Sequence, residues 1–162
     1  HTDGRFHFAP DWAALGPDYA IMPPLPDHMN NIDKATDEHP YRLVTAPARR
    51  FLNSTFTETP TSRRKEGRPT ALVHPDDCRD LGLEDGDRVR IGNARATVVV
   101  HVRPFAGLQS GVVVVEGIWP NKAFEGGLGI NALTSADPAP PAGGAVFHDT
   151  AVWLGAEKGR GR

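Results

Sequence analysis

The residues best suited to hold a ligand lie between positions 46 and 56, where polar, cationic and aromatic side chains follow one another without a regular period. Arg49 and Arg50 can each bind an oxyanion such as phosphate in a forked geometry that lysine cannot match. Asn53 and Ser54 add directional hydrogen-bond donors and acceptors. Packing alone does not explain this mixture, so we interpret the stretch as a loop that holds a polar, anionic group.

A second stretch of this kind runs from residue 116 to residue 134. It mixes glycines with single aromatic, amide and hydroxyl residues, among them Trp119, Asn131 and Thr134. Backbone N–H groups beside glycines can form nests that bind anions, and the rings of Trp119 and Phe51 offer flat apolar faces. Together the two loops predict a binding module for a large, flat, heteroatom-rich ligand that carries phosphate.

The sequence gives little support for independent catalysis or for a metal site. His148 and Asp149 are neighbours, and neighbouring residues in a strand point to opposite faces, so they cannot pair by themselves. Cys78 falls in an expected short helix without an activating neighbour. Spacings typical of metal ligands, of a P-loop or of a dinucleotide-binding glycine motif are absent from the sequence. We therefore expect no catalytic residue and no metal ligand in this chain.

Apolar runs between these loops predict a β-rich core with strands at about 41–45, 70–73, 88–91, 94–102, 112–115 and 145–154. The four valines at 112–115 predict a strand that is buried on both faces. Pro75 at a first helical position and Gly82 past the end predict a short helix over 75–81, and Gly86 supplies the positive φ of a turn. Residues 57–68 have no apolar face and predict a basic loop without regular structure, either mobile or in contact with an acidic partner.

The length of 162 residues allows one domain with extended flanks. Residues 1–40 contain six prolines, so we interpret them as an extended linker that leaves a preceding domain, with one short strand at Phe6 and Phe8. The domain itself is expected over 41–154. The basic, glycine-rich tail at 155–162 is expected to be disordered.

The composition of the chain bears on which partners it can bind and on where in the cell it is expected. The 18 Lys and Arg residues nearly balance 20 Asp and Glu residues, for a net charge of -2, so we expect no nucleic-acid partner. The single cysteine is weak evidence for a reducing compartment, and we expect a cytoplasmic location. No apolar run reaches about 18 residues, so no membrane span is expected. The chain starts without methionine, which predicts a fragment of a longer protein, whose targeting signal would be missing, or a tag scar.

Several short sequence blocks follow one another along the chain in an order that is typical of one protein family. They are Leu-Val-Thr-Ala-Pro-Ala-Arg-Arg-Phe-Leu-Asn-Ser-Thr-Phe (43–56), His-Pro-Asp-Asp (74–77) with Leu-Gly-Leu-Glu-Asp-Gly-Asp-Arg-Val (81–89), Glu-Gly-Ile-Trp (116–119), Gly-Ile-Asn-Ala-Leu-Thr (129–134) and Gly-Gly-Ala-Val-Phe-His-Asp-Thr (143–150). In this order they resemble the C-terminal molybdopterin-dinucleotide-binding domain of the DMSO reductase family of molybdenum and tungsten oxidoreductases. The Asp-Gly-Asp unit alone occurs in other double-psi barrels, but the blocks together are specific and cover about residues 41–154.

The resemblance implies a mainly β fold, a six-stranded double-psi β-barrel with short helices and long loops. In that family the barrel is the last domain of a larger catalytic subunit and covers molybdopterin guanine dinucleotide, present as a pair (bis-MGD) with molybdenum or tungsten. The metal and substrate then lie mainly in upstream domains, so the isolated domain is not expected to be catalytic. The implied partners are the remaining domains of that subunit and an electron-transfer subunit.

Carried onto this sequence, the resemblance also implies a set of cofactor-binding residues. They are Thr45, Ala46, Arg49, Phe51, Asn53, Ser54, Trp119, Asn131 and Phe147. Family members often have histidine where this chain has Arg50, so Arg50 is not in the set.

Two alternatives from other classes were weighed. A double-psi barrel can serve as a protein-interaction or substrate-recognition module without a cofactor, as in the N-domains of some ATPases; the two ligand-type loops favour the cofactor. A small enzyme resembling aspartate decarboxylase would need a Gly-Ser self-processing site, and the chain has no Gly-Ser dipeptide.

Overall fold

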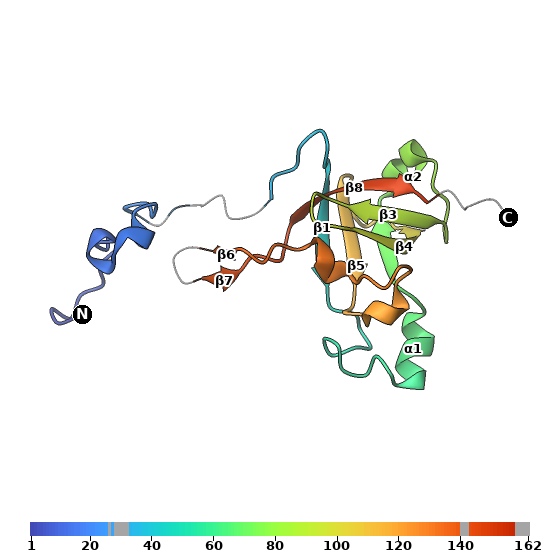
Figure 1. Ribbon diagram of the computed structural model, residues 1–162, viewed down its shortest axis with the longest axis horizontal. Coiled ribbons are helices and arrows are strands. Elements are labelled where there is room, and N and C mark those ends of the chain that lie inside the picture. Colours follow the sequence, from blue (N-terminus) through green and yellow to red (C-terminus); the bar gives the residue numbers. More distant parts are fainter. Residues whose placement is uncertain (26, 28–32, 140–142, 158–162) are drawn as a thin grey trace. The chain divides into compact units, whose positions relative to one another are not determined.

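The computed structural model describes residues 1–25, 27, 33–139 and 143–157, and the chain forms two units. The larger unit comprises 33–134 and 147–162 and contains a closed barrel of six strands (Figure 1). In order around the barrel these are β1 (Tyr41–Ala46), β5 (Val112–Glu116), β2 (Thr70–Val73), β4 (Thr97–Pro104), β3 (Arg88–Gly92) and β8 (Thr150–Ala156). The pairs β1–β5 and β2–β4 are parallel, and the other pairs are antiparallel. The predicted fold class is confirmed.

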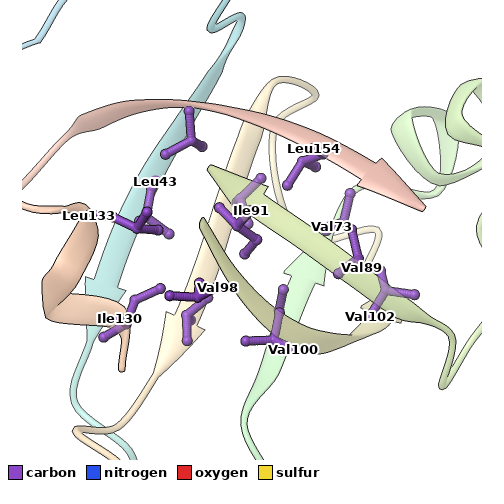
Figure 2. Packing of buried hydrophobic residues seen from close by; sticks show 14 of the residues in the cluster. Leu43, Val73, Val89, Ile91, Val98, Val100, Val102, Ile130, Leu133 and Leu154 are labelled. Carbon is purple, nitrogen blue, oxygen red and sulfur yellow. The ribbon is translucent and has the colours of Figure 1, made fainter. Parts of the chain in front are cut away.

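Alternate residues of β3, β4 and β5 are buried and fill the barrel together with residues of the other strands. Val89 and Ile91 of β3, Val98 and Val100 of β4 and Leu43 of β1 are almost completely buried and belong to one cluster (Figure 2). Period-2 alternation places one set of side chains inside a small barrel and the other set outside. β-branched residues suit this arrangement because they pack well on a pleated surface.

Helix α2 (Pro75–Leu81) confirms the predicted helix and ties the barrel to a neighbouring turn. Pro75 is in its first turn, and Gly82 ends it in the left-handed conformation at φ 64°. Asp77 is buried and accepts hydrogen bonds from the hydroxyl of Ser110 at 2.7 Å and from the N–H of Gly111 at 2.8 Å. These bonds hold the turn that leads into β5. Gly86 has the predicted positive φ, at 86°.

Two predictions for the larger unit were wrong. Residues 57–68 are not without structure, because α1 (Pro60–Glu66) forms there. Pro60 and Gly67 bracket α1 as Pro75 and Gly82 bracket α2, but α1 buries no residue and so leaves no apolar period in the sequence. The strand at 112–115 is not buried on both faces: Val113 and Val115 are buried, whereas Val112 and Val114 are partly exposed. A barrel strand has only one inner face.

The last strand was predicted at 145–154, and the structure gives it different bounds. The chain turns at Asp149, whose φ of 58° is incompatible with an extended strand, so β8 begins at Thr150. β8 then runs through Ala156, two residues past the predicted end of the domain. The tail predicted to be disordered over 155–162 is therefore ordered through residue 157, whose N–H donates to the carbonyl oxygen of Arg88, and 158–162 lie outside the described residues. The strand predicted at 94–102 is β4, three residues later at its start.

The smaller unit comprises 1–32 and 135–146. It contains two 3-10 helices, η1 (Ala13–Leu15) and η2 (Pro17–Tyr19), and a hairpin of β6 (Pro138–Ala139) and β7 (Gly144–Ala145). The rings of Trp12 and Tyr19 stack, and the indole N–H of Trp12 donates to the carbonyl oxygen of Pro23 at 2.8 Å. The short strand predicted at Phe6 and Phe8 does not form; their two rings meet edge to face.

Candidate functional site

Parallel pairing brings the two ligand-type loops together. β1 and β5 run in the same direction with Ala46 opposite Glu116, so the loops that follow them leave the barrel side by side. The N–H of Gly117 donates to the carbonyl oxygen of Ala46 at 2.8 Å, which continues the pairing one residue into the loops. Residues separated by about seventy positions in the sequence therefore become neighbours because of the strand direction.

Two further segments reach the same end of the barrel. β8 runs antiparallel to β1 with Thr150 opposite Leu43, so residues 147–149 lie near the end of β1. The 3-10 helix η4 (Ile130–Leu133) packs against β4, and the amide of Asn93 donates to the carbonyl oxygen of Leu133 at 2.8 Å. Figure 2 shows Ile130 and Leu133 within the buried cluster, whereas Asn131 between them is exposed.

These segments enclose a hollow of about 190 Å³, which we call the end hollow. Its lining consists of Thr45, Ala46, Pro47, Ala48, Asn53, Gly117, Ile118, Ile130, Asn131, Phe147 and His148. Five of the nine predicted site residues are thus brought together: Thr45, Ala46, Asn53, Asn131 and Phe147. The lining combines apolar walls with amide, hydroxyl and imidazole groups, which suits a planar ligand with many heteroatoms.

Phe51 and Trp119 lie beneath the loops and not in the lining. Their rings meet edge to face with centroids 4.8 Å apart, and each residue is only 6% exposed. Gly117 lies against this pair at φ 86°, where a Cβ atom would be 3.2 Å from Cδ2 of Phe51. The two rings therefore support the loops from the core side in this structure, and neither offers an open face for stacking.

The first loop carries Asn53 on a tight hairpin. Leu52 and Thr55 exchange backbone hydrogen bonds, and Asn53 between them has φ 52°, a left-handed conformation that asparagine tolerates. Ser54 is exposed, outside the lining, and its carbonyl oxygen accepts from the hydroxyl of the buried Thr57 at 2.9 Å. These bonds hold the tip of the loop beside the end hollow.

Arg49 and Arg50 are exposed on the same loop, outside the lining. Within the described ranges neither has a carboxylate at ion-pair distance. Both guanidinium groups therefore remain available to an external anion.

Ion pairs link the loops to each other and to the strands. Nζ of Lys122, in the second loop, lies 3.0 Å from Oε1 of Glu58, in the first, and this contact lowers the pKa of Glu58. Both side chains are exposed, so the pair adds little to stability. The hydrogen bond from Arg42 lowers the pKa of Asp149 beside the end hollow.

Sequence reasoning missed several lining residues, among them Ile118, Ile130 and His148. Ile130 was hidden because η4 is too short to show a period, and its role depends on the strand beneath it. The sequence shows His148 only as a neighbour of Asp149, and no local pattern indicates that its ring reaches the hollow. Among the described residues no group of three or more His, Cys, Asp or Glu is arranged to hold a metal ion. None of the helices that the described residues form has the length and apolar character needed to span a bilayer.

A closed six-stranded barrel with a hollow built from loops at one end is typical of a ligand-binding β-barrel domain. Residues 41–151 match the family model described as "Molydopterin dinucleotide binding domain". The chain belongs to this family, and it is a molybdopterin dinucleotide-binding domain of the kind found in DMSO reductase-family oxidoreductases. The predicted family is confirmed.

Relatives agree with this assignment, and a solved structure shares the fold. The chain is 32% identical over 118 residues to "Probable oxidoreductase YoaE" of Bacillus subtilis (strain 168), covering 73% of this chain and 17% of that protein. It is 27% identical over 144 residues to "Dimethyl sulfoxide reductase DmsA" of Escherichia coli (strain K12), covering 84% of this chain and 18% of that protein. Acetylene hydratase from Pelobacter acetylenicus shares the fold, with a TM-score of 0.69 at 19% identity over 90% of this chain and 22% of that one. The chain thus spans less than a fifth of the length of these curated relatives.

Proposed function

We propose that this domain covers molybdopterin guanine dinucleotide in a larger molybdenum- or tungsten-dependent oxidoreductase, where the cofactor is bis-MGD. The single observation that carries the proposal is the end hollow, in which three loops converge and place Thr45, Asn53, Asn131 and Phe147 around one space. Amide and hydroxyl groups on an apolar surface suit the edges of a pterin or a guanine, which carry donors and acceptors in one plane. Proteins that resemble the chain carry oxidoreductase names, which supports the redox assignment.

The size of the hollow indicates that the site is incomplete. Its volume of about 190 Å³ is below the roughly 300–1,000 Å³ of most ligand pockets. A dinucleotide therefore extends beyond it, and the rest of its surface must meet other parts of the polypeptide. We infer that the remaining domains of the parent subunit supply the metal ligand and substrate pocket, that an electron-transfer subunit supplies or removes electrons, and that the isolated domain binds the cofactor weakly and does not turn over substrate.

The residues take different roles in this proposal. Thr45, Ala46, Asn53, Asn131 and Phe147 contact the part of the cofactor in the end hollow. Arg49 and Ser54, at the open side of the first loop, meet the phosphates or the ribose that extend beyond it. Phe51 and Trp119 act indirectly, since they hold the loops in place from the core.

A protein-interaction module is the second candidate, and one observation favours it. Leu52 and Phe56 in the first loop are 65% and 53% exposed, which is a large apolar surface for a loop tip. A contact between these side chains and the rest of the parent subunit would bury them and so accounts for their exposure here. Such a contact is compatible with cofactor binding in the end hollow.

The test uses the longest natural polypeptide that contains this sequence. Purified under conditions that retain cofactors, it is expected to contain molybdenum or tungsten and to release a guanine nucleotide of pterin on extraction. Metal analysis and chromatography of the extracted pterin measure both. A well-folded polypeptide with neither metal nor pterin would refute the proposal and favour the interaction module.

A further inference from the structure

Arg42 in β1 joins three parts of the chain through one half-buried guanidinium group. Its Nε donates to the carboxylate of Asp149 at 2.5 Å, and its Nη2 donates to the backbone carbonyl oxygen of the same residue at 2.8 Å. Its Nη1 donates to the carbonyl oxygen of Asp33. Arg42 therefore holds both the side chain and the backbone of Asp149, and it is itself held at residue 33.

The residue that Arg42 holds is the one that turns the chain. Asp149 has φ 58°, a left-handed conformation that few residue types besides glycine, asparagine and aspartate adopt. This turn separates β8, which starts at Thr150, from the residues that reach the end hollow. Even for aspartate this conformation is uncommon, so contacts with the surroundings help to specify it. The two hydrogen bonds from Arg42 supply that specification.

The turn presents Phe147 and His148 to the end hollow. Both residues line it, and their rings are in contact with centroids 4.3 Å apart. Although His148 precedes Asp149 in the sequence, the carboxylate of Asp149 is directed to Arg42 and not to the imidazole. The imidazole can therefore exchange a hydrogen bond with a ligand in the hollow.

We propose that Arg42 is a positioning residue for the cofactor site, since it holds the turn at 147–149 so that Phe147 forms a wall of the end hollow and His148 hydrogen-bonds the ligand. The identity of that ligand rests on the proposed function, whereas the control of the turn by Arg42 does not. Arg42 is outside the lining and acts through Asp149.

The experiment compares variants of the longest natural polypeptide with its cofactor loaded. Arg42→Met removes all three hydrogen bonds, and Arg42→Lys keeps the charge without the fork. Arg90→Met is the matched control, because Arg90 also forms an ion pair on the barrel, with Nε 3.0 Å from Oε2 of Glu157, away from the hollow. Two quantities are measured: hydrogen exchange of the backbone amides at 147–150, and pterin nucleotide retained per polypeptide after gel filtration.

We expect Arg42→Met to speed exchange at 147–150 and to lower retained pterin by about tenfold, the scale of other changes that act through a second residue. Arg42→Lys should have a smaller effect on the exchange rate and on the retained pterin, and Arg90→Met should change neither quantity. Unchanged exchange in Arg42→Met, or equal pterin loss in Arg42→Met and Arg90→Met, would overturn the proposal. If the parent polypeptide holds no pterin, the cofactor part falls with the proposed function, and the exchange data alone decide whether Arg42 holds the turn.

The role of His148 is tested separately. His148→Ala should lower retained pterin without changing exchange at 147–150, and His148→Gln, which keeps a donor and an acceptor, should restore much of it. If His148→Ala retains as much pterin as the unchanged protein, the imidazole does not bind the ligand and that half of the proposal is wrong.

Discussion

Replacing Gly117 by alanine tests whether the end hollow depends on close packing beneath it. Gly117 has φ 86°, and a Cβ atom there would lie 3.0 Å from Cβ of Ala48, 3.2 Å from Cδ2 of Phe51 and 3.5 Å from Nε1 of Trp119. All three neighbours are buried, so none can move into solvent to make room. The added methyl group must therefore push the first loop away from the second.

The expected cost has two parts. A left-handed φ costs a residue with a Cβ atom about 1–2 kcal/mol. Overpacking in a filled site adds about 1–3 kcal/mol. Alanine also reduces the entropy of the unfolded chain, which offsets about 0.4–1 kcal/mol of the loss. We expect Gly117→Ala to lower the free energy of unfolding by about 1–5 kcal/mol, the sum of these terms.

Gly126→Ala is the matched control, because Gly126 has a similar φ of 83° and no atom within 4 Å of the added Cβ. The backbone and unfolded-state terms are the same for both variants. The difference between their free energies of unfolding therefore measures the overpacking beside Gly117 alone, and we expect it to be about 1–3 kcal/mol. Urea denaturation followed by far-ultraviolet circular dichroism measures both free energies and avoids the fluorescence of Trp119. If the two variants differ by less than about 0.5 kcal/mol, the packing beneath the hollow is looser than the structure indicates.

Three further predictions concern single contacts. Asp77→Ala should lower the free energy of unfolding by about 1–3 kcal/mol, because the buried carboxylate of Asp77 accepts two hydrogen bonds that the variant loses, and urea denaturation measures it. If the amide of Asn131 binds the ligand, Asn131→Ala should lower the pterin retained by the parent polypeptide by about tenfold. Gln109→Ala, at the other end of the barrel, is the control and should leave the retained pterin unchanged. Equal pterin retention in the two variants would show that Asn131 is not part of the site. Arg42 lowers the pKa of Asp149 from its ordinary value, so the stabilisation by the Asp149 carboxylate is complete above that ordinary value and is lost as the pH falls through the lowered pKa. Asp149→Asn removes this stabilisation, so it should lower the free energy of unfolding near neutral pH, change little at low pH and thereby flatten the acid limb of the stability–pH curve.

Local signals made part of the fold predictable. β2, β3 and α2 were predicted with nearly correct bounds because local signals specify them without reference to distant residues. A short apolar run marks β2, polar–apolar alternation marks β3, and Pro75 and Gly82 mark the ends of α2. α1 has the same bracketing residues, but a helix that buries nothing carries no apolar pattern. The order of blocks that indicates the family is likewise a property of the sequence alone, and the family model matches the same region.

The site was predictable in its residue types and not in its geometry. Thr45, Ala46, Asn53, Asn131 and Phe147 were assigned through the family resemblance, and the structure places them around one hollow. Phe51 and Trp119 belong to the same set, yet their rings are directed into the core. An aromatic residue in an irregular loop has no period that reveals whether its ring meets the core or a ligand.

The sequence by itself determined the class of domain, the local helix and turn signals and the presence of two loops with ligand chemistry. Only the tertiary structure decided which loop residues share a space. Parallel pairing of β1 with β5 brings Ala46 beside Gly117, and the contact between Arg42 and Asp149 spans 107 positions of sequence. Such contacts depend on strand direction and register around a closed barrel, and neither is encoded in any single stretch of residues.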